Sequence, residues 1–266
     1  MRFTLQVERL YAALIAAADL GPGPHGEAGL GGKLLYAGEL DGDGRALLVA
    51  GNIAGAASLG ATADAGAQKQ AVRDGVADFL VISLDEALRI LKNEIRKRET
   101  VGVCVGAAPQ AVEREMLERG VAPDLLRPAF SGASPSSVSF VERARRIVLA
   151  APGESQALLT WRVAAAPAQW LPKLDAIALD CVGADSGPAA WAARRWLRLA
   201  PRYLGRLAQG LRLMVCDRDF TADLIEQVRV RVERGEIGVA VEIQVSAGRQ
   251  HGQHWLVPPG DSHSAD

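Results

Sequence analysis

The stretch of residues 33–64 constrains the fold of this chain more than any other. It reads as a short apolar strand, a glycine-rich turn and an apolar helix that ends before a second strand. This order is typical of the unit that opens a nucleotide-binding sheet, where backbone N–H groups at the start of the helix hold a phosphate. The candidate cofactor-binding residues are therefore Gly38, Gly42, Gly44 and Arg45.

The same turn also carries acidic side chains, which are Glu39, Asp41 and Asp43. A pyrophosphate is itself an anion, so three carboxylates at the positive end of a helix oppose its binding. The G-x-G-x-x-G spacing is also broken, because Leu47 stands three positions after Gly44. Two interpretations remain open: a site in which Arg45 replaces backbone donors to a phosphate, or an acidic turn in which Arg45 pairs with Asp41 or Asp43.

Strands and helices alternate along residues 32–130. The pattern predicts strands at 34–37, 57–61, 78–82, 101–105 and 124–126, and helices within 68–75, 83–98 and 110–119. Ser83 is predicted to cap the helix 83–98, with Glu86 completing a capping box. Alternation with short loops specifies a parallel sheet with helices on both faces. The predicted fold class is therefore α/β, with a doubly wound, mostly parallel Rossmann-like sheet.

Glycine- and proline-rich segments divide the chain into five predicted parts. These are an N-terminal helix and linker at 1–31, a first α/β half at 32–130, a linker with a helix at 131–156, a second α/β half at 157–257 and a disordered tail at 258–266. The second half is predicted to contain strands at 158–163, 176–180, 211–216 and 238–245, and helices at 188–209 and 221–235. Pro201 is predicted to split the first of these helices.

Asp180 and Asp217 are the candidate catalytic residues. Each ends a predicted strand, and open parallel sheets bind ligands outside the carboxyl ends of their strands. Asp185 and Asp219 lie close to them in sequence. The alternative role for such acids is helix capping, which Asp219 fits well.

No metal site is predicted. The cysteines, Cys104, Cys181 and Cys216, lie far apart in apolar runs, which also excludes a disulfide framework. His251 and His254 have the spacing of one helix face, but no carboxylate partner is near them in the sequence.

Composition excludes two further classes of partner. The formal net charge of -1 argues against an electrostatic nucleic-acid binder. The helix 188–209 mixes tryptophans with arginines, but its leucines form an ordinary buried stripe, so we interpret its arginines as an exposed face. The apolar run 10–20 is too short to span a bilayer. The sequence thus predicts a cytoplasmic protein without a membrane or nucleic-acid partner.

The sequence of the first half resembles that of the central Rossmann-like domain of urocanase (urocanate hydratase). The matching residues, aligned without gaps over 32–75, are Gly32, Lys33, Leu34, Leu40, Gly42, Ala46, Ile53, Ala54, Gly55, Ala61, Asp64 and Gly75. A D-E-A-L helix start at 85–88 and an R-G-V-x-P-D step at 119–124 follow at similar spacing. The resemblance implies a Rossmann-like fold and tightly bound NAD, which urocanase uses as an electrophile to hydrate urocanate in histidine breakdown.

The departures from that pattern lie where the family's residues would face the cofactor. The M-x-G-A-Q-P segment of the family corresponds to D-G-R-A-L-L at 43–48, and the acidic residue suited to a ribose hydroxyl corresponds to Thr62. The G-N-A-A turn is G-A-A-P at 106–109, and L-L-R-P-A-F-S-G follows Asp124. None of the family's catalytic motifs is recognisable after residue 150.

Two functions remain open on the sequence. The first is a non-catalytic relative of urocanase that binds a small molecule or a protein partner, with self-association left open. The alternative is an NAD-binding hydro-lyase of histidine catabolism that uses Asp180 or Asp217 for proton transfer. The first is favoured because the substitutions concentrate where the chemistry would occur, although a fold alone does not decide activity.

Overall fold

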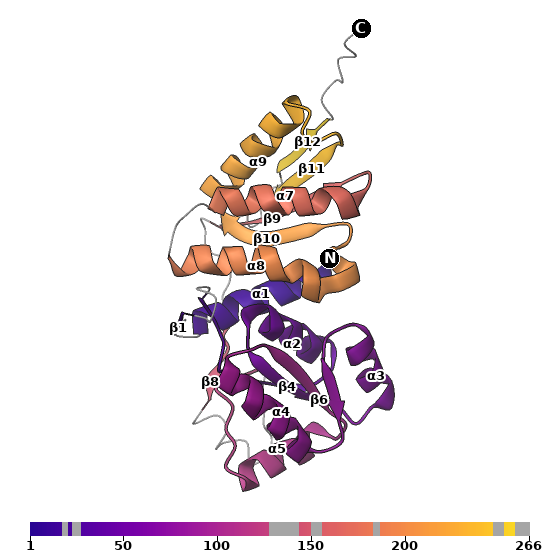
Figure 1. Cartoon of the computed structure of the whole chain (residues 1–266), viewed down its shortest axis with the longest axis vertical. Coiled ribbons are helices and arrows are strands. Elements are labelled where there is room, and N and C mark those ends of the chain that lie inside the picture. Colours follow the sequence, from indigo (N-terminus) through magenta and orange to yellow (C-terminus); the bar gives the residue numbers. More distant parts are fainter. Residues whose placement is uncertain are drawn as a thin grey trace. The chain divides into compact units, whose positions relative to one another are not determined.

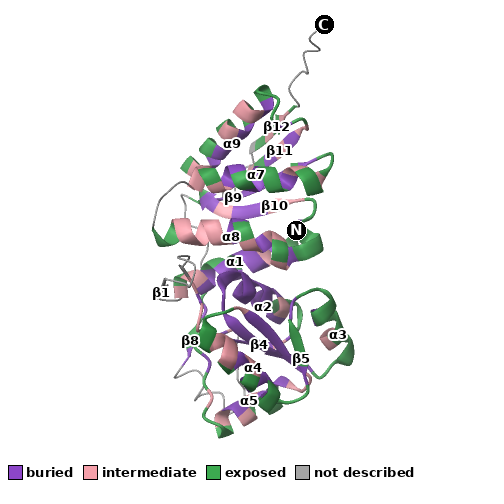
Figure 2. Ribbon diagram, viewed as in Figure 1, coloured by how far each residue is buried: buried purple, intermediate pink, exposed green. Residues whose placement is uncertain are grey.

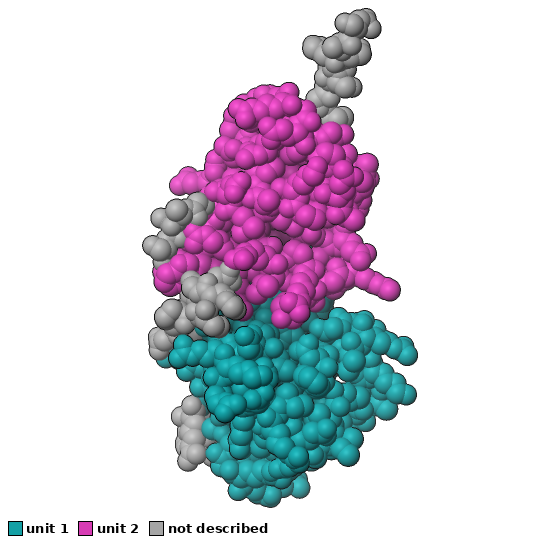
Figure 3. Space-filling view, in the orientation of Figure 1, with its two compact units in different colours: residues 1–150 teal, residues 151–266 magenta. Residues whose placement is uncertain are grey.

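The structure is a computed structural model that describes residues 1–17, 21–22, 28–127, 144–149, 156–182, 187–246 and 253–258. The chain divides into two compact units, residues 1–150 and residues 151–266, shown in two colours in Figure 3. Among the described residues, no helix is both long and apolar enough to cross a membrane.

The first unit contains a six-stranded sheet in which every pair of neighbouring strands is parallel. In the order β5-β6-β4-β3-β7-β8, the strands are Phe79–Val81, Val101–Val105, Ala57–Ala61, Leu34–Glu39, Leu125–Leu126 and Arg145–Arg146. The interleaved helices are α2 (Gly42–Ala54), α3 (Ala65–Arg73), α4 (Leu84–Lys97) and α5 (Pro109–Glu118), as Figure 1 shows. The predicted parallel α/β sheet is thereby confirmed. A separate antiparallel pair joins β1 (Gly21–Pro22) to β2 (Ala28–Gly29).

The order of the strands reverses beside β3. The chain passes from β3 to β4 and β6 on one side, and later adds β7 on the other side of β3. The carboxyl ends of β3 and β7 therefore flank the topological switch point, which is where open α/β sheets bind ligands. The residues that follow these strands are the turn at 40–44 and Arg127.

Helix α2 is buried at every position from Ala46 to Ala54, and Figure 2 shows it mostly in the colour of buried residues. One side faces the sheet, and the helix α1 (Arg2–Ala17) packs against another through Val7, Leu10 and Leu14, which are at most 4% exposed. This double cover explains the unbroken apolar run at 46–50, since a helix that is apolar all round is stable only in an interior.

Helix α4 begins as its sequence predicts. The Ser83 hydroxyl accepts a hydrogen bond from the backbone N–H of Glu86 at 3.3 Å. Its buried stripe of Leu84, Ala87, Leu88 and Leu91 faces the core that the sheet forms. The predicted N-cap is confirmed.

The second unit is also built from helices and strands, but its sheet is antiparallel. The strand order is β10 (Arg212–Asp217), β9 (Gln156–Val163), β11 (Val241–Ser246) and β12 (Gln253–Val257). Its helices are α7 (Pro167–Val182), α8 (Pro188–Leu204) and α9 (Arg218–Glu233), with a 3-10 turn at Gly205–Ala208.

The strand predicted at 176–180 is wrong, because these residues belong to α7. Leu171, Leu174 and Ile177 are buried at helical spacing, and a short apolar run alone does not distinguish a strand from a buried helix. The predicted break at Pro201 is also wrong, since α8 continues to Leu204. A proline removes one N–H, and here the buried Trp196, Leu197, Ala200 and Leu204 outweigh that cost.

The helix predicted within 131–156 is contradicted where the structure describes it. Residues 145–146 form β8, because the Arg145 N–H donates to the Asp124 carbonyl and the Ile147 N–H to the Leu126 carbonyl. The rest of that prediction, at 128–143 and 150–155, lies outside the described residues, as do Asp185, His251 and the tail from 259 onward.

Candidate functional site

The turn between β3 and α2 is capped by the chain's own carboxylate. Asp41 is the N-cap residue of α2, and its side chain accepts a hydrogen bond from the Gly44 N–H at 2.8 Å. Asp43 adds a second carboxylate in the first helical turn. The negative group that the helix N-terminus favours is therefore already supplied from within the chain.

The glycines of this turn have different structural roles. A Cβ on Gly44 would lie 1.9 Å from the Glu39 carbonyl oxygen, so only glycine allows the helix to approach the strand this closely. Gly38 has a φ of 71° beside a register irregularity between β3 and β4, and this conformation favours glycine. A Cβ on Gly42 would meet nothing within 4 Å.

Arg45 does not pair with the acids of the turn. Its guanidinium pairs with Asp74, the C-cap residue of α3. Asp74 also accepts a hydrogen bond from the Gln70 amide at 2.7 Å. The expected pairing of Arg45 with Asp41 or Asp43 is thus wrong, because Arg45 ties α2 to the end of α3.

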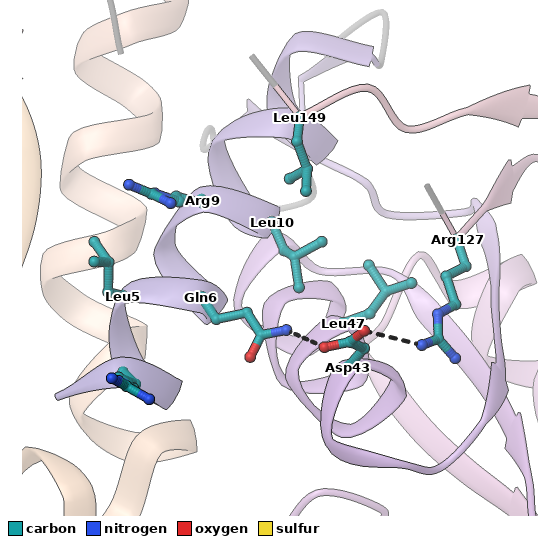
Figure 4. A pocket seen from close by; sticks show the side chains of 9 residues that line it. Leu5, Gln6, Arg9, Leu10, Asp43, Leu47, Arg127 and Leu149 are labelled. Atoms are coloured by element: carbon teal, nitrogen blue, oxygen red, sulfur yellow. Dashed lines mark hydrogen bonds and ion pairs between the residues drawn. The ribbon is translucent and has the colours of Figure 1, made fainter. Parts of the chain in front are cut away.

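Arg127 is the basic residue that meets the acidic turn. Its Nη2 lies 3.1 Å from Asp41 Oδ2 and 3.2 Å from Asp43 Oδ2, and its side chain is only 16% exposed. Gln6 of α1 donates to the other oxygen of Asp43 at 2.5 Å (Figure 4). We call Asp41, Asp43 and Arg127 the switch-point cluster. Arg127 was not predicted as a site residue, and its place directly after β7 was the available signal.

The residues present do not fit a dinucleotide at this turn. A pyrophosphate held there would meet the Asp41 carboxylate on the Gly44 N–H and the Asp43 carboxylate one residue away. Directly after β4, Thr62 is buried and its hydroxyl accepts from the Asp64 N–H at 3.3 Å, so the position of the family's ribose-binding acid holds a hydroxyl that is already hydrogen-bonded.

A pocket of about 340 Å³ opens beside the switch-point cluster within the first unit. Its lining consists of Arg2, Leu5, Gln6, Arg9, Leu10, Asp43, Leu47, Arg127 and Leu149. Leu10 and Leu47 are buried and form its apolar floor. The pocket thus combines apolar surface with charged groups, as small-molecule sites do.

Two titratable groups, one buried and one half-buried, form a hydrogen bond between β3 and α5. The Tyr36 hydroxyl donates to Glu113 Oε1 at 3.1 Å, and Tyr36 is fully buried in β3. Burial raises the pKa of Glu113, and the hydrogen bond from Tyr36 opposes that rise. Burial, assisted by the Glu113 charge, also raises the pKa of Tyr36 well above its usual value. Tyr36 therefore stays protonated and acts as a donor.

The two candidate catalytic aspartates do not lie at the carboxyl ends of parallel strands. Asp180 is an exposed residue of α7 whose Oδ2 lies 3.9 Å from Arg231 Nη2. Asp217 is the N-cap of α9 and accepts from the Phe220 N–H at 2.8 Å, a role expected for Asp219 instead. The premise of the catalytic prediction is wrong because the sheet of this unit is antiparallel.

Within the described part of the chain, no group of three or more His, Cys, Asp or Glu side chains could hold a metal ion. His254 does have a carboxylate partner, contrary to expectation, since its Nε2 lies 2.8 Å from Glu242 Oε1 across β11 and β12. Burial raises the pKa of the Cys104 thiol to about 11 and that of Cys181 to about 12, so neither is a ready nucleophile.

The parallel sheet, its strand order and the strand-turn-helix unit at its switch point define the first unit as a Rossmann-like α/β domain. The family model described as the urocanase Rossmann-like domain matches residues 11–143. This match spans half of the 266-residue chain. The chain belongs to the urocanase family.

Proposed function

We propose that this chain is a non-catalytic member of the urocanase family that binds a small molecule without using NAD. The observation that carries the proposal is the switch-point cluster, in which Arg127 is paired with Asp41 and Asp43. In this proposal the carboxylates of Asp41 and Asp43 replace the negative groups of a cofactor pyrophosphate, and they occupy the donors, including Arg127, that would otherwise bind it.

The energetics of the cluster favour this function over NAD-dependent hydration. A pyrophosphate would have to displace the Asp41 carboxylate from the Gly44 N–H and compete for Arg127, which is largely buried. Losing the N-cap contact of Asp41 costs about 1 kcal/mol, and each ion pair of Arg127 with a half-exposed carboxylate is worth up to about 1 kcal/mol. The displaced carboxylates would then repel the incoming anion.

The test is to denature the purified full-length chain and search for released NAD by mass spectrometry, followed by an assay for loss of urocanate absorbance. We expect neither NAD nor turnover. NAD in stoichiometric amount, together with urocanate consumption, would contradict the proposal and support the NAD-dependent hydro-lyase instead.

A control makes the negative result informative. NAD is added back in excess to the wild type and to an Arg127→Leu variant before the urocanate assay. We expect no turnover in either sample, since the acidic turn remains in both. Turnover that appears only after NAD is added would show a cofactor lost during purification and would overturn the proposal.

A further inference from the structure

The pocket beside the switch-point cluster is formed by one face of α1 and the start of α2. Four of its lining residues, Arg2, Leu5, Gln6 and Arg9, are spaced three, four and seven positions apart on α1, which places them on one side of that helix. Arg2 and Arg9 lie two turns apart, about 10 Å along the helix axis. Figure 4 shows the Arg9 and Arg127 side chains on opposite sides of the floor residues Leu10 and Leu47.

The charges of the pocket favour a monoanion. Arg127 is paired with Asp41 and Asp43, so its positive charge is already taken up by these two carboxylates. Arg2 and Arg9 are exposed, and neither has an ion-pair partner among the residues that the structure describes. An arginine fork matches the two oxygens of a carboxylate. A dianionic phosphate would be repelled more strongly by Asp43, which also lines the pocket.

The size and the walls of the pocket favour a compact aliphatic body. A volume of about 340 Å³ is near the lower end of ligand pockets, which span roughly 300–1,000 Å³. Besides the buried floor, Leu149 lines the pocket while being 52% exposed, so apolar surface is available at its edge. Covering such surface is worth about 25 cal/mol per Å².

We propose that this pocket binds a small aliphatic carboxylate, with its chain on Leu10 and Leu47 and its carboxylate held by Arg9, while Arg2 adds positive charge on the same side of α1. This proposal deepens the proposed function and rests on it, because it names the ligand class of the non-catalytic site. The Gln6 amide, which donates to Asp43, keeps that acid turned toward Arg127 and away from the bound anion.

The test is isothermal titration of octanoate into the full-length chain, with octanamide as the neutral analogue of equal length. We expect octanoate to bind with one-to-one stoichiometry and octanamide to bind at least about 10-fold more weakly, since one charged hydrogen bond is worth a factor of that size. Equal affinity for the two molecules, or no binding of octanoate, would overturn the proposal.

Variants locate the site. We expect Arg9→Gln to weaken octanoate binding about 10-fold, and Arg2→Gln with Arg9→Gln to weaken it further. The matched control is Arg73→Gln, an exposed arginine of the same unit that does not line the pocket. If the Arg9→Gln variant, the variant with both arginines replaced and the Arg73→Gln control all bind octanoate equally, the ligand binds outside this pocket and the proposal is overturned. An NAD-free chain that fails to bind octanoate contradicts only this proposal, whereas released NAD contradicts the proposed function.

Discussion

Gly42 and Gly44 lie two positions apart in the first turn of α2 but differ in the space around them. A methyl group on Gly44 would meet the Glu39 carbonyl, whereas one on Gly42 would meet nothing within 4 Å. We expect Gly44→Ala to lower the free energy of unfolding by about 1–3 kcal/mol. We expect Gly42→Ala to leave it unchanged or raise it by about 0.5–1 kcal/mol, because alanine favours a helix over glycine. Urea denaturation followed by circular dichroism measures both, and equal effects would contradict the predicted contact.

Glu113 makes stability depend on pH in a defined direction. Because burial raises its pKa in the folded chain above the usual 4.5, its contribution to stability is complete below that value and is lost as pH rises through the folded pKa. Glu113→Gln removes the titrating group. The variant should therefore gain stability relative to the wild type as pH rises from about 4.5 toward neutrality. Parallel stability curves for the two proteins over this range would contradict the prediction.

At the scale of elements, a buried ion pair joins α7 to β10. Arg212 Nε lies 2.9 Å from Asp175 Oδ2, and both side chains are 12% exposed. Burial raises the pKa of Asp175 even though Arg212 opposes the shift, so the carboxylate depends on this partner. Arg212→Leu should lower the free energy of unfolding of the second unit by about 3–5 kcal/mol.

Tryptophan fluorescence reports on the unfolding of the second unit selectively, because all the tryptophans lie in that unit, at 161, 170, 191, 196 and 255. The control is Arg212→Met combined with Asp175→Leu, which removes both charges and should recover most of the loss. A single variant as stable as the wild type would show that the pair contributes nothing.

The elements that the sequence predicted well are those whose signals are local. The strands at 57–61 and 101–105 and the cap at Ser83 depend on short apolar runs and one hydroxyl, and the structure has them at these positions. Helix α7 was missed at 176–180 because its identity depends on packing against the rest of the unit. The antiparallel order of β10-β9-β11-β12 was also missed, since pairing between distant strands leaves no local pattern.

At the scale of the whole molecule, the family and the parallel sheet were predictable, whereas the site was predictable only in part. The acids of the turn were visible in the sequence, and Asp41 and Asp43 do occupy the switch point. Their partner Arg127 was not identified, because it reaches them only through the pairing of β3 with β7. The pocket depends likewise on α1 packing against α2, a contact between segments that nothing local connects.

The central claim is that the chain's own carboxylates and Arg127 have replaced the phosphate-binding function of the first turn. Isothermal titration of NAD into the full-length, nucleotide-free chain tests it most directly. We expect no saturable binding up to about 1 mM NAD, which corresponds to a binding free energy weaker than about -4 kcal/mol. One-to-one binding at micromolar concentration, lost in an Arg127→Leu variant, would contradict it.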